Sequence, residues 1–129
     1  MSGTKQDYIN YRVQKSDEIF EDAKLLAQNM RWNSCVNRLY YSTFYLTSAL
    51  LYKNDINAET HNGTKKQFNL HFVKTGKIEL ELGKLFSSLF DWRHETDYAD
   101  FVDFDKETVQ PLLEQVENFN KKLKALIIS

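Results

Sequence analysis

The sequence predicts an all-α protein, folded as an up-and-down bundle of four to five helices. One reason is a shortage of turn residues, since the 129 residues include four Gly and one Pro and strands joined by tight turns need more of both. A second reason is that apolar residues recur at steps of three and four along four long segments, which is the spacing of one helix face. The sequence has no repeat, no low-complexity segment and no domain boundary, so residues 1–129 are expected to form one helical domain.

The first two segments predict a long amphipathic helix followed by a helix in the middle of the bundle. Residues 7–30 place their apolar side chains on one stripe, with charged residues between them. Residues 33–53 are apolar most of the way round, which is typical of a helix that is covered on several sides. The single cysteine, Cys35, lies among these apolar residues and is expected to be a buried small hydrophobe rather than a nucleophile.

A connection, a short helix and a third long helix are expected next. Residues 54–63 are rich in Asn, Asp and Gly and have no apolar period, which is typical of a loop. A short helix is expected from residue 64 to about residue 75, followed by Gly76, which tolerates the left-handed conformation after a last helical turn. Residues 78–90 then form a third long stripe, in which Gly83 either weakens the helix or lets another segment lie close to it.

The last part of the chain predicts an acidic loop and a final amphipathic helix. Residues 91–105 include six acidic residues, one basic residue and several aromatic ones, and are expected to be a loop with aromatic anchors. The final helix is expected to begin between Asp105 and Thr108, either of which can cap it. Its apolar stripe makes Val116 and Phe119 core residues.

Charge and motif content exclude several classes of protein. The 17 Lys and Arg residues are balanced by 18 Asp and Glu residues, which excludes the uniformly basic surface of a protein that coats nucleic acid. No apolar run is long enough to span a membrane and residues 1–11 lack the apolar core of a secretory signal, so a cytoplasmic location is expected. The sequence has none of the common glycine-rich phosphate loops or zinc motifs, and its three histidines are not paired on a helix face, so neither a cofactor nor a metal site is expected.

Two groups of polar residues are candidate binding surfaces. Arg38 and Tyr41 belong to a set of polar and aromatic residues that share one face of the central helix. His61, Lys65 and Lys66 begin a 17-residue stretch with four lysines and no acidic residue. Both groups fit an anion-binding surface. The sequence leaves two alternatives open, a satisfied polar seam for the first group and a solvated helix face for the second.

The third candidate group surrounds Arg93. A guanidinium can hold a phosphate in two-point contact, and His94 supplies an imidazole that can move protons near neutral pH. Asp97 and Tyr98 carry groups that can orient such an imidazole. These are parts that a ribonuclease uses. A structural cluster of contacts that joins a helix end to the following loop uses the same side chains, and both interpretations remain open here.

Four short strings, in this order along the chain, resemble the small bacterial and archaeal members of the HEPN superfamily (higher eukaryotes and prokaryotes nucleotide-binding). They are NRLYYSTF from residue 37, THNG from residue 60, LHFVKTG from residue 70, and Arg93 followed by Asp97 and Tyr98. The resemblance covers about residues 16–120. It implies an all-α bundle that commonly dimerises. Many such proteins resemble toxins that cleave RNA without a metal and are encoded beside a minimal nucleotidyltransferase partner that neutralises them.

The ribonuclease motif of this superfamily matches the chain in part. The motif is an Arg, frequently followed by Asn, Asp or His, and then a closing His several residues later. Arg93 and His94 match the first two positions. The positions where the closing His would fall hold Tyr98, Ala99 and Asp100. The chain therefore has an Arg-x-x-x-Asp-Tyr variant, which lacks the imidazole expected to do acid-base work.

Carried over to this chain, the resemblance implies a protein that binds RNA or a nucleotide as one component of a toxin-antitoxin or defence module with a minimal nucleotidyltransferase partner. Arg93 would contact phosphate, with the other residues of its group around it, and an active protein would be a metal-independent endoribonuclease. The wider anion-binding surface would consist of Arg38, Tyr41, His61, Lys65 and Lys66. The alternative is a non-catalytic helical interaction module in which the Arg93 group is structural.

Two expectations about geometry complete the sequence analysis. On a helix Asp97 returns to the side of Arg93 while His94 points about 100° away, so Arg93 and Asp97 are expected in contact and the isolated protein is expected to be a weak ribonuclease or none. Aromatic residues near this place exceed what one small core covers, so a homodimer that brings the two Arg93-containing ends together is also expected. These aromatic residues are Phe90, Trp92, Phe101 and Phe104.

Overall fold

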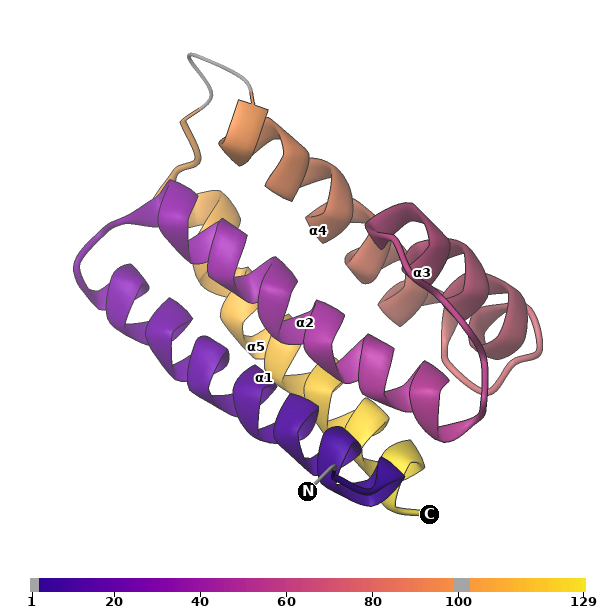
Figure 1. The fold of residues 1–129 in the computed structure, drawn as a ribbon. Helices are drawn as coiled ribbons and strands as arrows, with labels where there is room; N and C mark the ends of the chain where they lie inside the picture. Colours follow the sequence, from indigo (N-terminus) through magenta and orange to yellow (C-terminus); the bar gives the residue numbers. More distant parts are fainter. Residues whose placement is uncertain (1–2, 99–102) are drawn as a thin grey trace.

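Five α-helices and a short π-helix make up the described part of the chain, residues 3–98 and 103–129 of the computed structural model (Figure 1). The α-helices are α1 (Lys5–Gln28), α2 (Trp32–Lys53), α3 (His61–Phe68), α4 (Leu80–Tyr98) and α5 (Lys106–Ile128), and the π-helix is Asn69–Val73. These residues contain no β-strand, so the all-α prediction is confirmed.

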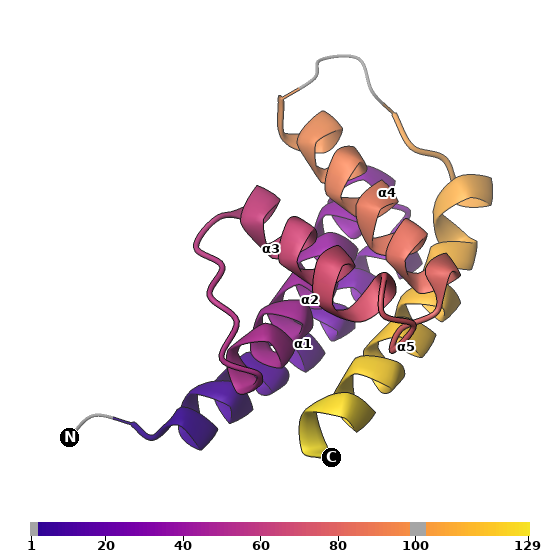
Figure 2. The same cartoon turned by 90° about the vertical axis from the view of Figure 1, so that its right-hand side faces the viewer.

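The four long helices alternate in direction, as the up-and-down prediction requires. α1 and α4 run one way and α2 and α5 run the other way (Figure 1), while α3 lies beside α2 and α4 (Figure 2). α2 touches each of the other four α-helices, and 11 of its 22 residues are buried. α2 is therefore the middle helix of the bundle, as predicted from the apolar residues on most of its circumference.

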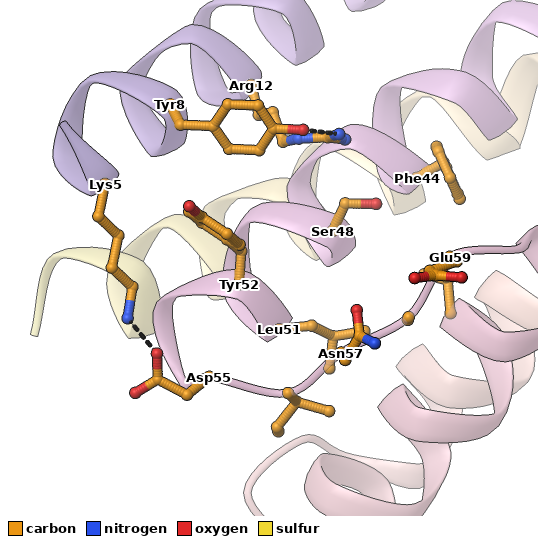
Figure 3. Close-up of a pocket in the computed structure, with 13 residues that line it drawn as sticks. Lys5, Tyr8, Arg12, Phe44, Ser48, Leu51, Tyr52, Asp55, Asn57 and Glu59 are labelled. Carbon is orange, nitrogen blue, oxygen red and sulfur yellow. Dashed lines mark hydrogen bonds and ion pairs between the residues drawn. The ribbon is translucent and has the colours of Figure 1, made fainter. Parts of the chain in front are cut away.

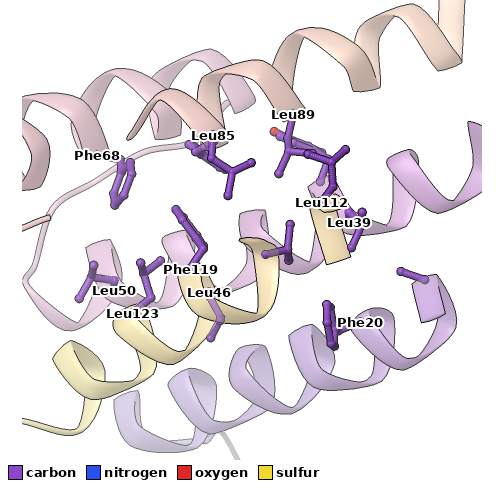
Figure 4. Close-up of a cluster of buried hydrophobic side chains, with 14 of the residues drawn as sticks. Phe20, Leu39, Leu46, Leu50, Phe68, Leu85, Leu89, Leu112, Phe119 and Leu123 are labelled. Atoms are coloured by element: carbon purple, nitrogen blue, oxygen red, sulfur yellow. The ribbon is translucent and has the colours of Figure 1, made fainter. Parts of the chain in front are cut away.

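Aromatic rings from three helices meet in the core, and Figure 4 shows two of them, Phe68 and Phe119. Phe68 of α3, Phe86 of α4 and Phe119 of α5 have ring centroids 5.4–5.9 Å apart, and all three side chains are fully buried. Val116, one turn before Phe119, is fully buried as well, so both core predictions for the last helix are confirmed. Cys35 is buried as predicted, and burial raises the pKa of its thiol to about 11.

α3 begins three residues earlier than the sequence predicts, because the last residues of the expected loop form its first turn. The Thr60 hydroxyl accepts a hydrogen bond from the Gly63 N–H over 2.8 Å and so caps the helix. Gly76, beyond the π-helix, has a φ of +80°, the left-handed conformation predicted for it. A Cβ at Gly83 would lie 2.9 Å from Val73 Cγ2, so the close approach expected there is made by a side chain.

α4 extends through residues 91–98, so the prediction of a loop is wrong for this part of residues 91–105. The acidic composition that suggested a loop does not prevent a helix here. Arg93 lies one turn after the buried Leu89 and pairs with Asp97 one turn later, and both relations favour continued helix. Three residues named in the sequence analysis, Ala99, Asp100 and Phe101, lie outside the described residues.

The residues just before α5 anchor the start of that helix. The Phe104 N–H donates to Asn33 Oδ1 over 2.8 Å, and the Phe104 ring lies 6.0 Å from that of Trp92, centroid to centroid. This is one of the aromatic anchors that the sequence predicts. Asp105 Oδ1 accepts a hydrogen bond from the Thr108 N–H over 2.9 Å, so the predicted cap of the last helix is confirmed.

Replacing Phe119 by Ala is expected to lower the free energy of unfolding by about 3 to 5 kcal/mol. The substitution deletes a fully buried ring and leaves a cavity where α3, α4 and α5 meet. Urea unfolding of the wild type and the variant measures the difference. The exposed neighbour Asn118 provides the control, since Asn118→Ala is expected to change the free energy by less than about 0.5 kcal/mol. A loss below about 1 kcal/mol for Phe119→Ala would contradict the burial of this face of α5.

Candidate functional site

The candidate site lies where the end of α4 passes the first half of α2 and the start of α3. Arg93 reaches this place because it follows the buried Leu89 by one turn, on the face of α4 that packs against α2. Its side chain is only 12% exposed. The guanidinium carbon lies 5.4 Å from the ring centroid of Tyr40 and 5.9 Å from that of Phe90. Two aromatic rings therefore border the guanidinium, and their electron-rich faces stabilise its positive charge.

A carboxylate also holds Arg93, as predicted. Arg93 Nη1 lies 3.6 Å from Asp97 Oδ2, while Asp97 Oδ1 accepts a hydrogen bond from Asn37 Nδ2 over 2.9 Å. A strong bond between a guanidinium and a carboxylate is about 2.7–2.9 Å long, so this ion pair is loose. Arg93 Nε is buried and has no hydrogen-bond partner within the described part of the chain. The guanidinium is therefore incompletely satisfied.

A histidine from α3 faces the same aromatic ring. The capped first turn of α3 places His61 Nδ1 2.7 Å from the Tyr40 hydroxyl, and the imidazole stacks on Phe44 with 4.3 Å between ring centroids. Burial raises the pKa of Tyr40, although Arg93 acts in the opposite direction, so the hydroxyl keeps its proton. The hydroxyl and Nδ1 share one hydrogen bond, and the tautomer of His61 decides which of them donates.

Burial and neighbouring charges set the ionisation of the site. Burial lowers the pKa of His61 and the charge of Arg93 lowers it further, while Asp97 acts in the opposite direction. The imidazole is therefore neutral at pH 7. Burial also acts to lower the pKa of Arg93, but Tyr41 and Asp97 raise it more, so the net shift is upward and the guanidinium stays charged. A permanent cation thus lies near an imidazole whose protonation responds to any anion that binds.

Other residues that the sequence predicts for a site gather around this centre. The Arg38 guanidinium carbon lies 5.1 Å from the ring centroid of Tyr41. Lys65 Nζ lies 4.6 Å from the ring centroid of Phe90, the ring that also borders Arg93. Three cations, from α2, α3 and α4, therefore surround one group of aromatic rings.

The remaining predicted site residues are His94, Lys66 and Tyr98. His94 is exposed although Arg93, its neighbour in sequence, is nearly buried, so it faces another direction, as predicted. Lys66 is also exposed and, one residue after Lys65, points to a different side of α3. Tyr98 is the last residue of α4, and its side chain lies outside the described part of the structure.

Tyr40 is the functional residue that the sequence analysis missed. Tyr40 lies between Leu39 and Tyr41 on the predicted middle helix, where an aromatic side chain is ordinarily a core residue. The hydroxyl gains a role only through His61, which lies far along the chain. A signal was available, since the two residues occur in two of the strings that resemble the HEPN superfamily.

Within residues 3–98 and 103–129, no group of three or more His, Cys, Asp or Glu side chains is placed to hold a metal ion. Over the same residues, no helix combines the length and the apolar character that crossing a membrane requires.

Comparison with known proteins identifies the family. The family model of the HEPN domain matches residues 9–126, which include α2, α3, α4 and every residue of the site. The chain belongs to the HEPN family. The resemblance seen in the short sequence strings is thereby confirmed, and a helical bundle is the fold that it implied.

The HEPN domain is similar over most of its length to proteins of Thermotoga maritima and Methanocaldococcus jannaschii. A "UPF0332 protein" of Thermotoga maritima is 40% identical over 123 residues, which are 95% of this chain and 93% of the relative. "Putative toxin MJ0142" of Methanocaldococcus jannaschii is 31% identical over 117 residues, which are 91% of this chain and 80% of the relative. "Putative toxin MJ0605" of the same organism is 28% identical over 125 residues, 95% of this chain and 93% of the relative. The likeness therefore extends through the whole bundle.

The pKa of His61 is expected to lie below the ordinary histidine value of about 6.5. It should rise in Arg93→Gln, which removes a nearby positive charge, and fall further in Asp97→Asn, which removes a negative one. NMR titration of the imidazole protons measures all three values. Arg31→Gln removes an exposed charge at the start of α2 and serves as the control that leaves the pKa of His61 unchanged. A pKa that stays the same in Arg93→Gln would contradict the electrostatic arrangement.

Proposed function

We propose that this HEPN domain, taken as residues 1–129, binds the phosphodiester backbone of RNA at the Arg93 site. The observation that carries the proposal is a charged guanidinium, 12% exposed, whose carboxylate partner Asp97 lies at 3.6 Å. A phosphate offers two acceptor oxygens in a geometry that matches the guanidinium fork. It can therefore form shorter and better aligned hydrogen bonds with Arg93 than the present ion pair.

The surrounding residues support binding of a strand rather than of an isolated phosphate. Arg38 and Lys65 flank Arg93 on α2 and α3, and the exposed Lys66 adds a further positive charge on another side of α3. Neighbouring phosphates of a strand would each find a cation there. The partly exposed ring of Tyr41 offers a face for a base, since bases of single strands stack on aromatic side chains.

The same residues support metal-independent cleavage of the bound strand. In this reaction the 2′-oxygen of the RNA forms a bond to the adjacent phosphorus, and the bond from phosphorus to the 5′-oxygen breaks. Arg93 stabilises the negative charge that develops on the phosphate oxygens. The bound phosphate raises the pKa of His61, so the imidazole takes up a proton and delivers it to the leaving 5′-oxygen, while water accepts the 2′-hydroxyl proton. Because Asp97 competes with phosphate for Arg93, the isolated protein is expected to react slowly.

We also propose that the domain is one component of a toxin-antitoxin or defence module. The relatives of Methanocaldococcus jannaschii that carry toxin in their names support this part of the proposal. The partner would be a minimal nucleotidyltransferase, as in the proteins that the sequence strings resemble. Because RNA is the target, the proposal places the protein in the cytoplasm.

A homodimer that brings the two Arg93-containing ends together completes the proposal. Trp92 and Phe104 pack partly against each other, but apolar side chains remain exposed where α1 turns into α2. This turn lies at the same end of the bundle as the end of α4 (Figure 1). Leu25 is 56% exposed and Met30 is 72% exposed there. Burial of such side chains favours association. In the dimer, His94 of the second copy could enter the site beside Arg93.

One observation favours a second candidate function, that of a non-catalytic interaction module. Arg93, Asp97 and Asn37 form a connected set of contacts between α4 and α2, as expected of a structural cluster of contacts. In that case Arg93 would contribute to stability, and a partner protein would hold the activity. The two candidates predict different effects of removing the guanidinium. The first predicts a loss of RNA cleavage, and the second predicts a loss of stability.

The purified protein is expected to cleave single-stranded RNA slowly in the presence of EDTA. Arg93→Gln is expected to reduce the rate by about a hundredfold or more, because the group that stabilises the transition state is removed. His61→Asn is expected to reduce it by about a hundredfold or more as well, because the proton donor is lost. Asp97→Asn is expected to raise the rate, because it frees Arg93 from its competitor. Gel analysis of end-labelled RNA gives the rates, and fluorescence anisotropy separates binding from cleavage.

His71→Asn is the matched control, since His71 is also on a helical turn but is exposed and bonded to Gln67. It is expected to cleave at the wild-type rate. Thermal unfolding of every variant checks the fold, and an Arg93→Gln protein that mainly loses stability would favour the structural candidate. Cleavage that survives Asp97→Ala and is abolished by His94→Ala would overturn the role given to His61.

Light scattering is expected to give twice the 15.3 kDa mass of the chain. Met30→Asp should shift the protein toward the monomer, because it places a charge in the proposed interface. Ile128→Asp is the control, since Ile128 is 85% exposed at the other end of the bundle, and it should leave the mass unchanged. A wild-type mass of 15.3 kDa at tens of micromolar protein would reject the dimer.

A further inference from the structure

A pocket of about 490 Å³ lies beside the C-terminal half of α2 (Figure 3), and Arg93 is not among the residues that line it. It lies between the first turns of α1, the last turns of α2, the connection over residues 55–59 and the start of α3. Small-molecule sites have volumes of roughly 300–1,000 Å³, so the pocket is large enough for a small ligand. Phe44 is the wall that it shares with the other site, because this ring lines the pocket and stacks on His61.

Aromatic rings and cations form one wall of the pocket. The rings of Tyr8 and Tyr52 lie 4.8 Å apart, centroid to centroid, and the two residues are 43% and 42% exposed. The guanidinium carbon of Arg12 lies 4.7 Å from the Tyr8 ring centroid, and Lys5 Nζ lies 5.7 Å from that of Tyr52. This combination suits a ligand with a planar aromatic part and an anionic part.

The two cations differ in how far their charge is already balanced. Lys5 Nζ lies 2.5 Å from Asp55 Oδ1 and forms an ion pair with it. Arg12 instead donates to the hydroxyl of Tyr8, which is uncharged, and no carboxylate of the described residues pairs with it. Arg12 is half-buried, so its charge is also partly shielded from water. An anion bound in this pocket would therefore form an ion pair with Arg12.

Hydrogen-bonding side chains form the opposite wall. Asn57 and Glu59 lie across the pocket from Arg12 (Figure 3). The connection that carries them is tied to α2, because the Ile56 N–H donates to the Leu51 carbonyl oxygen over 3.0 Å. An amide and a carboxylate are the groups that recognise the exocyclic amino group of a base and the ring nitrogen beside it.

We propose that this pocket binds one nucleotide unit whose base has an amino group beside an acceptor ring nitrogen on its Watson–Crick edge, namely adenine or cytosine. The base stacks on Tyr52 with its amino edge toward Asn57 and Glu59, and the phosphate lies on Arg12. The unit is either a free mononucleotide or one nucleotide of an RNA strand. This second site goes beyond the proposed function and does not depend on it, since its contacts involve none of the residues around Arg93.

NMR titration of the full chain with AMP, read at the amide resonances of residues 55–59, tests the proposal locally. Saturable shifts are expected at these positions. Arg12→Gln should weaken AMP binding by roughly tenfold or more, because it removes a charge-assisted contact. Tyr52→Ala should weaken it by roughly fivefold or more, because it removes the stacking ring. UMP, which lacks the amino group, and adenosine, which lacks the phosphate, should both bind more weakly than AMP.

Two matched controls are available outside the pocket. Tyr11→Ala and Arg31→Gln remove an exposed tyrosine and an exposed arginine and should leave AMP binding as in the wild type. Thermal unfolding shows whether Arg12→Gln and Tyr52→Ala keep the fold, which their surface positions permit.

A 5′-phosphorylated oligoadenylate, titrated in the same way, separates the two sources of the nucleotide. Equal affinities for AMP and the strand would assign the pocket to free mononucleotides, and tighter binding of the strand would assign it to RNA. The proposal is overturned if neither ligand shifts residues 55–59, if Arg12→Gln and Tyr52→Ala bind AMP like the wild type, or if AMP and UMP bind equally. Such a failure leaves cleavage at Arg93 unaffected, so it is distinguishable from a failure of the proposed function.

Discussion

A single buried hydroxyl determines how the candidate site is arranged. Tyr40 is fully buried in the middle helix, and an unpaired hydroxyl there would cost about 1–3 kcal/mol. His61 satisfies it, so α3 cannot slide along α2 without breaking this hydrogen bond. The ring of the same tyrosine borders the guanidinium of Arg93. One residue of α2 thus fixes the place where an imidazole from α3 and a cation from α4 meet.

A second buried polar network fixes the other side of α2 by the same means. Ser16 Oγ donates to the Ser42 carbonyl oxygen over 2.7 Å, and Ser42 Oγ donates to the Ser16 carbonyl oxygen over 3.0 Å. Asn120 Nδ2 donates to Ser42 Oγ over 3.0 Å, so the network joins α1, α2 and α5 at one level. Apolar contacts tolerate small sliding movements, whereas buried hydrogen bonds do not. The two networks together hold α2 in register with α1, α3 and α5.

Local spacing accounts for the parts of the fold and of the site that the sequence predicts. The stripes of the long helices and the contact of Arg93 with Asp97 depend on residues one or two turns apart, and both are confirmed. The hydrogen bond between Tyr40 and His61 joins positions 21 residues apart, and no periodicity in the sequence reveals such a pair. The prediction of a loop over residues 91–98 is wrong for another reason. Acidic composition favours exposure, but it carries no information about an ion pair along the helix or about the side chains that the helix buries.

The carboxylate next to Arg93 has a consequence for selectivity. In the folded protein the guanidinium is already removed from water and lies beside the carboxylate of Asp97. The free-energy cost of desolvating the cation therefore arises on folding and not on ligand binding. An incoming anion must therefore displace a negative group, and it gains nothing from charge alone. The displaced carboxylate keeps its hydrogen bond from Asn37, which makes the exchange feasible. A single-point anion such as chloride gains little from this exchange, whereas an anion with two suitably spaced oxygens gains both hydrogen bonds. In the proposed function, Asp97 thus acts as an internal competitor that selects ligands by shape.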